Sequence, residues 1–487
     1  MLTIEEYSSY DATGLAELIK SGQVTASEVQ EVALAAVELA DERLGAVAEG
    51  PFPAPPPPAA ASAVFAGVPF VLKDLLCHAA GIPVHSGSRA LAAGAVFDHD
   101  SELMARFRRA GLALVASAKS PEFGLNAVTE PLLGGPACNP WDPARSPGGS
   151  SGGCAALVAA GAVPLAHAND GAGSIRIPAG HNGLVGLKPS RGRIPLGPDL
   201  QELMYGNVVE FAVTRSVRDS ATLLDAVHGY SPGEKYGAPH PARPYSAEVG
   251  AEHSPLRIAW CADSWTSLPL DPDVERVLES TARLLESLGH HVEQVRPAID
   301  WEAFLAALTT TFCAGTAASV IPLGEALGGG LSGDHFEAST IACAEAGRRV
   351  TPMDLERAFA INNTLSRVMG TFMQAWDVLL TPTAITPAVE LGTFDSDDAS
   401  LSAEQWVRKV IEPHPICPIY NVTGAPAISV PAGISADGLP IGVHLGAQMY
   451  REDLLLRLAS QLEQAAPWSH RRPRLHVAGP AAVAAAR

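Results

Sequence analysis

The sequence predicts an α/β fold built as one large domain. Strand-like and helix-like segments alternate along the chain, and 487 residues are within the range of large single-domain α/β enzymes. Hydrophobic residues make up 47% of the chain and charged residues only 17%. Such an apolar content is far above that of a disordered chain, so we expect a packed globular protein.

Residues 1–66 are predicted to form a helical segment followed by a proline-rich connection. Apolar residues at 15–19 indicate a first helix, and Thr25 with Glu28 three residues later is the capping-box motif that begins a second. Prolines crowd residues 51–58. We expect that stretch to be extended and to lie on the surface.

Residues 67–300 carry the alternating elements and form the predicted core. A short apolar run at 68–72 indicates a buried strand that ends at Lys73. The elements predicted after it are helix 101–110, strand 112–115, helix 152–161, strand 163–168, strand 256–261, helix 273–288 and strand 291–295.

The rest of the chain divides into two parts. Residues 301–410 are less regular and more helical, and we expect them to form a variable lobe over the site, apart from a core strand at 376–383. Residues 411–487 return to the core with strand-like runs at 427–442 and a closing helix at 452–464. The whole is predicted to be one compact catalytic domain.

Charge and cysteine content exclude several classes of protein. The chain has 33 Lys and Arg against 52 Asp and Glu, a net charge of −19, which repels phosphate backbones, so no nucleic-acid partner is expected. The seven cysteines are scattered singly, as is typical of buried reduced thiols. The chain begins without the pattern of a signal peptide, and we expect no apolar run long enough to span a bilayer. These features predict a cytoplasmic enzyme without a membrane partner.

A stretch rich in glycine and serine, residues 146–178, brackets one predicted helix and one predicted strand. It is not a phosphate-binding loop, because Gly153 is followed by Cys154 where Gly-Lys-Ser or Gly-Lys-Thr would be needed. Residues 148–152 match the G-x-S-x-G pattern of an α/β-hydrolase elbow, but proline-rich loop precedes them instead of a strand. Both interpretations are therefore disfavoured.

The same stretch resembles the amidase signature family. The residues that carry the resemblance are Gly148-Gly149-Ser150-Ser151-Gly152-Gly153, Asp170-Gly171-Ala172-Gly173-Ser174-Ile175-Arg176-Ile177-Pro178 and Gly186-Leu187-Lys188-Pro189. The resemblance extends to Gly67-Val68-Pro69 with Lys73-Asp74, to Asn421-Val422-Thr423-Gly424-Ala425-Pro426-Ala427 and to Pro440-Ile441-Gly442-Val443. Within the family, the C-terminal run and Ala168-Asn169-Asp170 are most similar to 6-aminohexanoate cyclic-dimer hydrolases. The resemblance implies a large mixed sheet covered by helices on both faces.

The resemblance also implies a catalytic triad. Ser174 would be the nucleophile, Ser150 a bridging serine on a cis peptide bond, and Lys73 the base. A lysine can accept a proton only when neutral, so Lys73 needs a pKa well below about 10.4, which burial at the end of a strand would supply. The oxyanion hole would consist of backbone N–H groups of Gly171, Ala172, Gly173 and Ser174.

Neighbouring residues are expected to support this triad. Asp170 and Arg176 flank the nucleophile and are predicted to form an ion pair that fixes the loop, and Ser151 to hydrogen-bond nearby. Ala172 and Asn169 differ from the family's usual Gly and Thr, so the geometry of the hole is open at position 172. His167 and His181 are interpreted as packed core residues.

The predicted substrate is a small amide, carbamate or ester. Its pocket is predicted to include Phe123, Gly124, Leu125, Asn126 and Cys313, with Phe312 and Ile321 as further candidates. No cluster has the spacing of metal ligands, and no metal or cofactor is expected. A homodimer is a further expectation from the family.

Two alternatives stay open beside a stand-alone amidase. The first is the glutaminase subunit of a tRNA-dependent amidotransferase, which is disfavoured because Ile177 stands where those subunits usually have Gln. The second is a binding protein that has lost its nucleophile, which is disfavoured because Lys73, Ser150 and Ser174 are all present.

Overall fold

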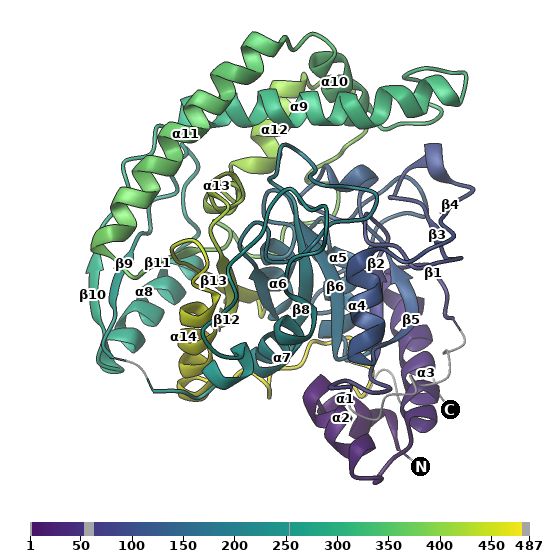
Figure 1. The fold of residues 1–487 in the computed structure, drawn as a ribbon, viewed down its shortest axis with the longest axis vertical. Helices are drawn as coiled ribbons and strands as arrows, with labels where there is room; N and C mark the ends of the chain where they lie inside the picture. The colour runs from purple at the N-terminus through teal and green to yellow at the C-terminus, as the bar shows by residue number, and fades with distance from the viewer. Residues whose placement is uncertain (1, 53–62, 253, 480–487) are drawn as a thin grey trace.

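The computed structural model describes residues 2–52, 63–252 and 254–479, and the predicted extended connection lies outside them from residue 53 on. Eleven strands form one sheet in the order β1-β5-β2-β6-β8-β7-β12-β13-β11-β9-β10, packed between helices (Figure 1). The strands are β1 (Val47–Glu49), β2 (Pro69–Lys73), β5 (Ala113–Ala118), β6 (Leu165–Asp170), β7 (Val185–Lys188), β8 (Val209–Thr214), β9 (Arg257–Trp260), β10 (His291–Gln294), β11 (Val378–Pro382), β12 (Ala427–Ile434) and β13 (Pro440–Gly446). A separate pair consists of β3 (Pro83–Val84) and β4 (Ala95–Val96).

The sheet is mixed, as predicted. β2 is parallel to both β5 and β6, and β9 is parallel to both β10 and β11. Antiparallel pairs such as β6 with β8 and β12 with β13 join the rest. Strands β7 and β8 were not predicted, because they are short, are buried along their whole length and lack an alternating pattern.

The helices begin and end where local sequence signals place them. Thr25 and Glu28 form the expected capping box, and Gly111 ends a helix in the left-handed conformation. The helices are α1 (Ile4–Ser9), α2 (Ala12–Lys20), α3 (Ala26–Leu44), α4 (Glu102–Ala110), α5 (Gly152–Ala159), α6 (Arg176–Asn182), α7 (Val217–Val227), α8 (Pro272–Ser287), α9 (Trp301–Ala326), α10 (Ala338–Gly347), α11 (Pro352–Ala375), α12 (Ala403–Ile411), α13 (Ile416–Thr423) and α14 (Glu452–Ala465).

The ends of two parallel strands determine where the site forms. β2 is buried at all five positions and ends at Lys73, while its parallel neighbour β6 ends at Asp170. Because the carboxyl ends of parallel strands meet at the same edge of a sheet, Lys73 and the last residues of β6 lie together. The loop that follows β6 carries Ser174.

A helical lobe covers this edge of the sheet. Helices α9, α10 and α12 lie together at the top of the molecule in Figure 1, and α11 runs from there down the left side. The predicted lobe 301–410 also contains β11, which pairs with β13 and β9 in the main sheet, so the lobe is two helical segments around one core strand. The division of the chain into these parts stays a proposal.

Helix α9 corrects the expectation that the chain has no apolar run long enough to span a bilayer. Residues 303–324 contain no charged side chain, and α9 is long and apolar enough to cross a membrane by length and composition. In the structure, 61% of the most apolar 18-residue stretch of α9 is buried inside the protein, and the helix packs against α10 and α11. Core helices meet the same length criterion, because packing against other helices buries the same apolar surface.

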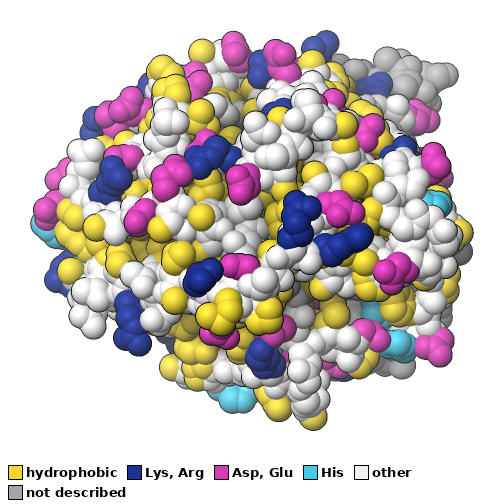
Figure 2. All heavy atoms as spheres, turned by 90° about the horizontal axis from the view of Figure 1, so that it is seen from above, with side chains coloured by type: hydrophobic (Ala, Val, Ile, Leu, Met, Phe, Trp, Pro, Cys, Tyr) yellow, Lys and Arg dark blue, Asp and Glu magenta, His cyan; other side chains and the backbone are white. Residues whose placement is uncertain are grey.

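The helical lobe presents a mixed surface. Figure 2 shows that Lys and Arg side chains are interspersed with Asp and Glu over the face seen from above, with hydrophobic side chains between them. This face carries no single-sign patch of the kind that condenses on a phosphate backbone.

Candidate active site

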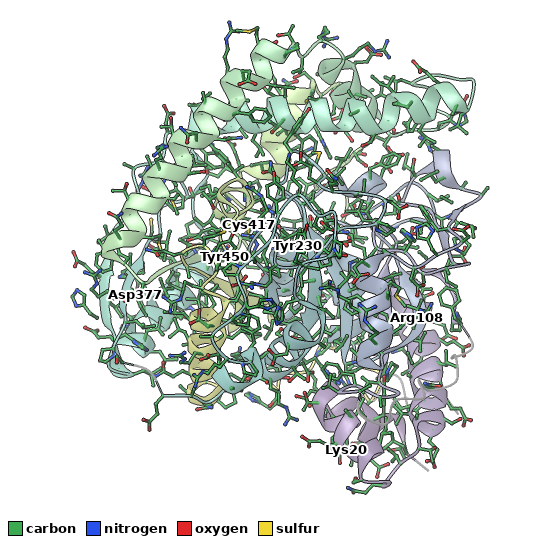
Figure 3. The ribbon with its side chains drawn as sticks, in the orientation of Figure 1. Lys20, Arg108, Tyr230, Asp377, Cys417 and Tyr450 are labelled. Atoms are coloured by element: carbon green, nitrogen blue, oxygen red, sulfur yellow. The ribbon has the colours of Figure 1, made fainter. Side chains whose placement is uncertain are left out.

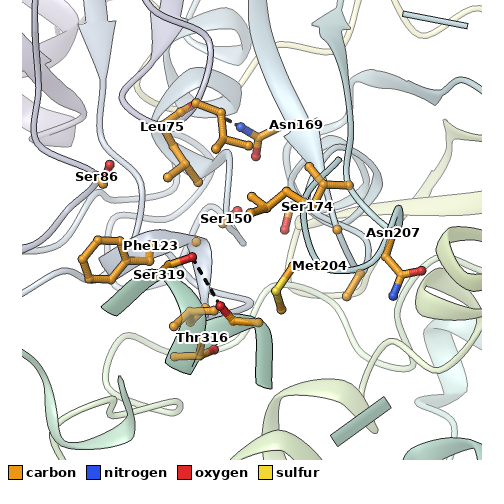
Figure 4. A pocket seen from close by; sticks show the side chains of 18 of the residues that line it. Leu75, Ser86, Phe123, Ser150, Asn169, Ser174, Met204, Asn207, Thr316 and Ser319 are labelled. Atoms are coloured by element: carbon orange, nitrogen blue, oxygen red, sulfur yellow. Dashed lines mark hydrogen bonds between the residues drawn. The ribbon is translucent and has the colours of Figure 1, made fainter. Parts of the chain in front are cut away.

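A cavity of about 410 Å³ lies between the carboxyl edge of the sheet and the helical lobe. Its walls come from five segments: 75–78, 84–101, 123–127, 196–210 and 308–320. Ser150, Ser174 and Asn169 also line it, and Figure 4 shows the two serines next to each other. Since most other lining side chains are apolar, the cavity suits an uncharged ligand with a few polar groups.

Lys73 is buried beneath the cavity floor. Its Nζ lies 2.6 Å from Oγ of Ser150 and 2.6 Å from Oδ1 of Asn169. Burial lowers the pKa of Lys73 to about 7, although the more distant Cys154, Asp170 and Glu210 act in the opposite direction. A lysine with this pKa is largely neutral just above pH 7 and can accept a proton from Ser150.

Ser150 follows the expected cis peptide bond. The bond between Gly149 and Ser150 is cis, which confirms the prediction. A Cβ on Gly149 would lie 2.7 Å from the backbone N and O atoms of Val128, so only glycine fits there. Ser151 is buried, and its hydroxyl donates to the carbonyl oxygen of Asn169 at 3.3 Å, the supporting contact that was expected.

Ser174 stands in the loop between β6 and α6, and Asp170 holds this loop from within. The Asp170 carboxylate accepts hydrogen bonds from the N–H of Gly173 at 2.7 Å and of Ile175 at 3.1 Å. The Ser174 hydroxyl has no hydrogen-bond partner among the described residues and is partly exposed to the cavity. It is therefore free to meet a substrate carbonyl.

The predicted oxyanion hole needs one correction. Because the Gly173 N–H already donates to Asp170, it is not available to an oxyanion. Within the described part of the chain, the N–H groups of Gly171, Ala172 and Ser174 have no partner. The sequence left open whether the loop needs a positive φ at Ala172, which alanine disfavours. The structure places the positive φ, 127°, at Gly173 and not at Ala172.

The expected ion pair between Asp170 and Arg176 is confirmed. Nε and Nη2 of Arg176 donate to the two carboxylate oxygens at 2.9 and 3.0 Å, and both side chains are fully buried. Burial alone would raise the pKa of Asp170, but the Arg176 charge and its hydrogen bonds hold it well below its usual value. The pair is permanently charged and fixes the loop that carries Ser174.

Helix α13 and β13 complete the surroundings of Arg176. Its Nη2 also donates to the carbonyl oxygen of Cys417 at 2.9 Å and to Oδ1 of Asn421 at 2.7 Å, and its Nη1 lies 3.0 Å from Nε2 of His444. Figure 3 shows Cys417 near the centre of the molecule. The amide of Asn421 in turn donates to Oδ1 of Asp170 at 2.9 Å. The sequence motif around Asn421 thus contacts the loop that carries Ser174.

Four of the five residues predicted to contact the substrate line the cavity. They are Phe123, Gly124, Leu125 and Asn126. Oγ of Ser150 would lie 3.1 Å from a Cβ placed on Gly124, so this segment packs directly against Ser150. Nδ2 of Asn126 donates to the carbonyl oxygen of Phe394 at 2.9 Å, which fixes that side chain in the wall.

Cys313 does not line the cavity, and neither does Ile321. Phe312 and Thr316 on the same helix do, and position 313 points about 100° away from 312 around the helix axis. Cys313 instead lies against α10, where its hydrogen bond to Cys343 and burial raise the pKa of the Cys343 thiol. The prediction of Cys313 as a substrate contact is corrected in favour of Phe312.

Comparisons with known proteins agree with this geometry. The family model described as Amidase matches residues 17–456. The chain belongs to the amidase family. It is 37% identical over 479 residues to the 6-aminohexanoate-cyclic-dimer hydrolase of Paenarthrobacter ureafaciens, covering 96% of each chain, and 37% identical over 470 residues to the putative amidase AmiC of Mycobacterium tuberculosis, covering 94% of this chain and 95% of that one.

Solved structures show the same relationship. A structure of 6-aminohexanoate cyclic dimer hydrolase has a TM-score of 0.89 and 35% identity, covering 96% of this chain and 99% of that one. A bacterial aryl acylamidase of the amidase signature family has a TM-score of 0.82 and 26% identity, covering 94% and 97%. The predicted family and fold are confirmed, and the amidase is a hydrolase of carbon–nitrogen bonds in non-peptide amides.

Sequence reasoning missed several residues of this amidase site. Asn169 was given no role beyond its place in the sequence pattern, yet its Oδ1 accepts a hydrogen bond from Lys73. Leu203, Met204 and Asn207 line the cavity from a long loop between β7 and β8 that carries no motif. Contacts of this kind come from distant segments, so no local spacing reveals them.

The two histidines interpreted as core residues are buried. Burial lowers the pKa of His181 to about 4, so its ring is neutral near pH 7. Nδ1 of His167 lies 3.3 Å from the backbone nitrogen of Lys73, which donates to it. Neither ring lines the cavity.

Proposed function

We propose that the protein is a serine amidase that cleaves small, mostly apolar linear or cyclic amides through an acyl-enzyme on Ser174. The observation that carries the proposal is the 2.6 Å contact between Nζ of the buried Lys73 and Oγ of Ser150, which itself lines the cavity beside Ser174. A serine hydroxyl becomes an effective nucleophile only when a base takes its proton during attack, and a neutral lysine can act as that base.

In the first half of the proposed reaction, Oγ of Ser174 attacks the carbonyl carbon of the substrate. The Ser174 proton passes to Ser150, and the Ser150 proton passes to Nζ of Lys73. The carbonyl oxygen becomes an oxyanion that accepts hydrogen bonds from the free N–H groups of Gly171, Ala172 and Ser174. One such donor is worth about 10²- to 10³-fold in rate.

The tetrahedral intermediate then breaks its carbon–nitrogen bond. The proton returns from Lys73 through Ser150 to the leaving nitrogen, which departs as a neutral amine, or stays tethered when the substrate is cyclic. In the second half, water attacks the Ser174 ester and gives its proton to the same relay. The acid forms, and Ser174 regains its hydrogen.

The substrate class follows from the cavity walls and from the relatives. The walls are mostly apolar, which favours a largely uncharged substrate. Relatives named as 6-aminohexanoate cyclic dimer hydrolases and as an aryl acylamidase support small cyclic amides and anilides. Carbamates and esters present the same carbonyl to Ser174, so we include them in the proposed range.

The amidotransferase alternative is not favoured. Ile177 lines the cavity with an apolar side chain at the position where those subunits usually carry Gln. A solved glutamyl-tRNA(Gln) amidotransferase chain from Thermotoga maritima is similar at a TM-score of 0.75 and 23% identity, a likeness of fold alone. All seven cysteines are free thiols, which supports a cytoplasmic location. The homodimer stays a prediction.

A substrate panel tests the proposal. Purified protein is assayed against an anilide, a small cyclic amide, an aryl carbamate, an ester and glutamine, with Ser174→Ala as control. We expect turnover of the first two at least, and loss of at least about 10³-fold in Ser174→Ala with an unchanged melting temperature, because this hydroxyl has no partner among the described residues. Activity on glutamine alone, or full activity of Ser174→Ala, would refute the proposal.

A further inference from the structure

Two histidines and an aspartate converge at the wall of the cavity, far apart in sequence. Nε2 of His78 lies 3.4 Å from Oδ2 of Asp199, and Nε2 of His99 lies 3.2 Å from both Asp199 oxygens. His78 and Asp199 line the cavity. His78 is almost fully buried, while His99 and Asp199 are about 40% exposed at their side chains.

The hydrogen bonds on the far side of each ring determine where the ring protons are. Nδ1 of His78 lies 3.1 Å from the carbonyl oxygen of Leu76, which can only accept, so Nδ1 carries the hydrogen. Nδ1 of His99 lies 2.8 Å from the Asp98 carboxylate and donates in the same way. Nε2 of each ring therefore faces Asp199 and is the nitrogen that a metal ion could bind.

One atom of this arrangement is left unsatisfied. Two ring nitrogens and a carboxylate face one another, and Nε2 of His78 is buried without a hydrogen-bond partner among the described residues. A metal ion that replaced the proton between His99 and Asp199 would also give Nε2 of His78 a partner. The ligand atoms all lie within 4.8 Å of one another, close enough for one ion to contact all three.

We propose that His78, His99 and Asp199 bind a divalent first-row transition cation of the Zn²⁺ class. Two imidazoles and one carboxylate form a common set of three protein ligands, with a fourth position left for water. Bond lengths of about 2.0–2.1 Å in a tetrahedral site place ligand atoms about 3.3 Å apart. The 3.4 Å and 3.2 Å distances to Asp199 match that spacing.

The surroundings of the rings support the same assignment. Histidines that bind metal almost always donate their other ring N–H to a carbonyl or carboxylate, and here Leu76 and Asp98 accept these bonds. The ring of Phe97 stacks on His78 with centroids 3.8 Å apart and an angle of 18°, which fixes the orientation of the ligand. The cation would join the segment 76–99 to the loop that carries Asp199.

A second cluster in the structure shows why this one is distinct. Cys77, His167 and Glu210 also lie within 4.8 Å of one another and are buried. There, Nδ1 of His167 accepts from the Lys73 N–H, so the ring hydrogen is on Nε2 and faces Glu210 at 3.4 Å. Burial raises the pKa of the Cys77 thiol well above its usual value, so it stays protonated. A protonated thiol is a poor metal ligand, so this cluster is the weaker candidate for a cation site.

Zinc binding by the full-length protein tests the proposal. Protein stripped with a chelator is titrated with ZnCl₂ against a chromophoric competitor, and its melting temperature is measured with and without zinc. We expect one zinc per chain and a higher melting temperature with zinc, because a ligand that binds only the folded state stabilises it. Absence of stoichiometric binding would overturn the proposal.

Variants locate the site. His99→Ala and Asp199→Asn remove ligands that are partly exposed, so both should fold, and each should weaken zinc binding more than about 100-fold. Asp98→Asn changes only the partner of His99 and should weaken it about 10- to 100-fold. His291→Ala is the matched control, since His291 is exposed and lies 3.6 Å from Glu293 with no third candidate ligand among the residues that the structure describes. Unchanged affinity in both ligand variants would place the zinc elsewhere and overturn the proposal.

Discussion

Oδ1 of Asn169 accepts a hydrogen bond from Nζ of Lys73 at 2.6 Å, while Nδ2 of the same amide donates to the carbonyl oxygen of Leu75 at 3.1 Å. Since the carbonyl can only accept, the amide cannot flip, and a neutral oxygen always faces the lysine. A neutral acceptor orients one N–H of the amine without favouring the charged form as a carboxylate would. The remaining lone pair of the neutral amine is left for Ser150.

Asn169→Asp should therefore move the pH profile toward alkaline values. A carboxylate beside Lys73 favours the ammonium form and should raise the pKa of Lys73 by about 1 to 3. The fraction of neutral lysine at pH 7 then falls, and kcat/KM falls with it, to recover as the pH rises. The profile of kcat/KM between pH 6 and 10 measures this, with Asn169→Ala as the uncharged control. Equal shifts in both variants would contradict the charge argument.

The wild-type profile should itself report Lys73. Because burial lowers the pKa of Lys73 to about 7, kcat/KM should rise about tenfold per pH unit below pH 7 and level off above it. Lys73→Ala should lose about 10²- to 10⁴-fold near pH 7.5 and less at pH 10, where hydroxide can take the proton. A profile that is flat between pH 5.5 and 8, or an equal loss at both pH values, would exclude Lys73 as the base.

Much of this site could be predicted because its residues follow strong local signals. The apolar run 68–72 predicted a buried strand, and the position of Lys73 at its end permitted the burial that the structure shows. The residues around Ser150 and Ser174 form a continuous motif. Recognising that motif led to the predictions of the cis bond and of the Asp170–Arg176 pair. Strands β7 and β8 were missed because wholly buried short strands lack alternation.

The features that could not be predicted depend on which way side chains and backbone groups point once the helices and strands have packed together. Cys313 and Phe312 are neighbours in an apolar helix, and only the packing of α9 on α10 decides which one faces the cavity. The Gly173 N–H was expected in the oxyanion hole, but the Asp170 side chain takes it. The ligands of the proposed cation site are separated by 21 and 100 positions, so no motif connects them.

Gly173→Ala and Ala172→Gly should differ sharply in their effect. Gly173 has a φ of 127°, and a Cβ there would lie 2.7 Å from Cβ of Cys417 and 2.7 Å from Cδ1 of Ile177. The loop must move, and a displacement of about 1 Å at Ser174 can lower kcat about 10²-fold. Ala172 has no left-handed φ, so glycine there adds only backbone freedom worth about 1 kcal/mol, about fivefold at most. Steady-state kinetics of both variants on one anilide check this, and similar losses would contradict it.

Asp170→Asn should destabilise the fold as well as inactivate the enzyme. The change leaves the fully buried Arg176 without its carboxylate, and breaking a buried pair in this way costs about 3–5 kcal/mol of unfolding free energy. Because the folded pKa of Asp170 is held below its unfolded value of about 3.9, its contribution is fully present above that value and is lost only as the pH falls further, toward the folded pKa. The difference from wild type should thus be constant between pH 6 and 8.

Urea unfolding measures this difference, with Glu279→Gln as the matched control. Glu279 forms an exposed pair with Arg283 at 3.4 Å, and exposed pairs contribute less than about 1 kcal/mol because water and salt screen them. If the two substitutions changed stability equally, the Asp170–Arg176 pair would not be what fixes the catalytic loop. A large loss for Asp170→Asn alone ties the stability of the core to the geometry of Ser174, since the same carboxylate holds the N–H of Gly173 and of Ile175 on either side of the nucleophile.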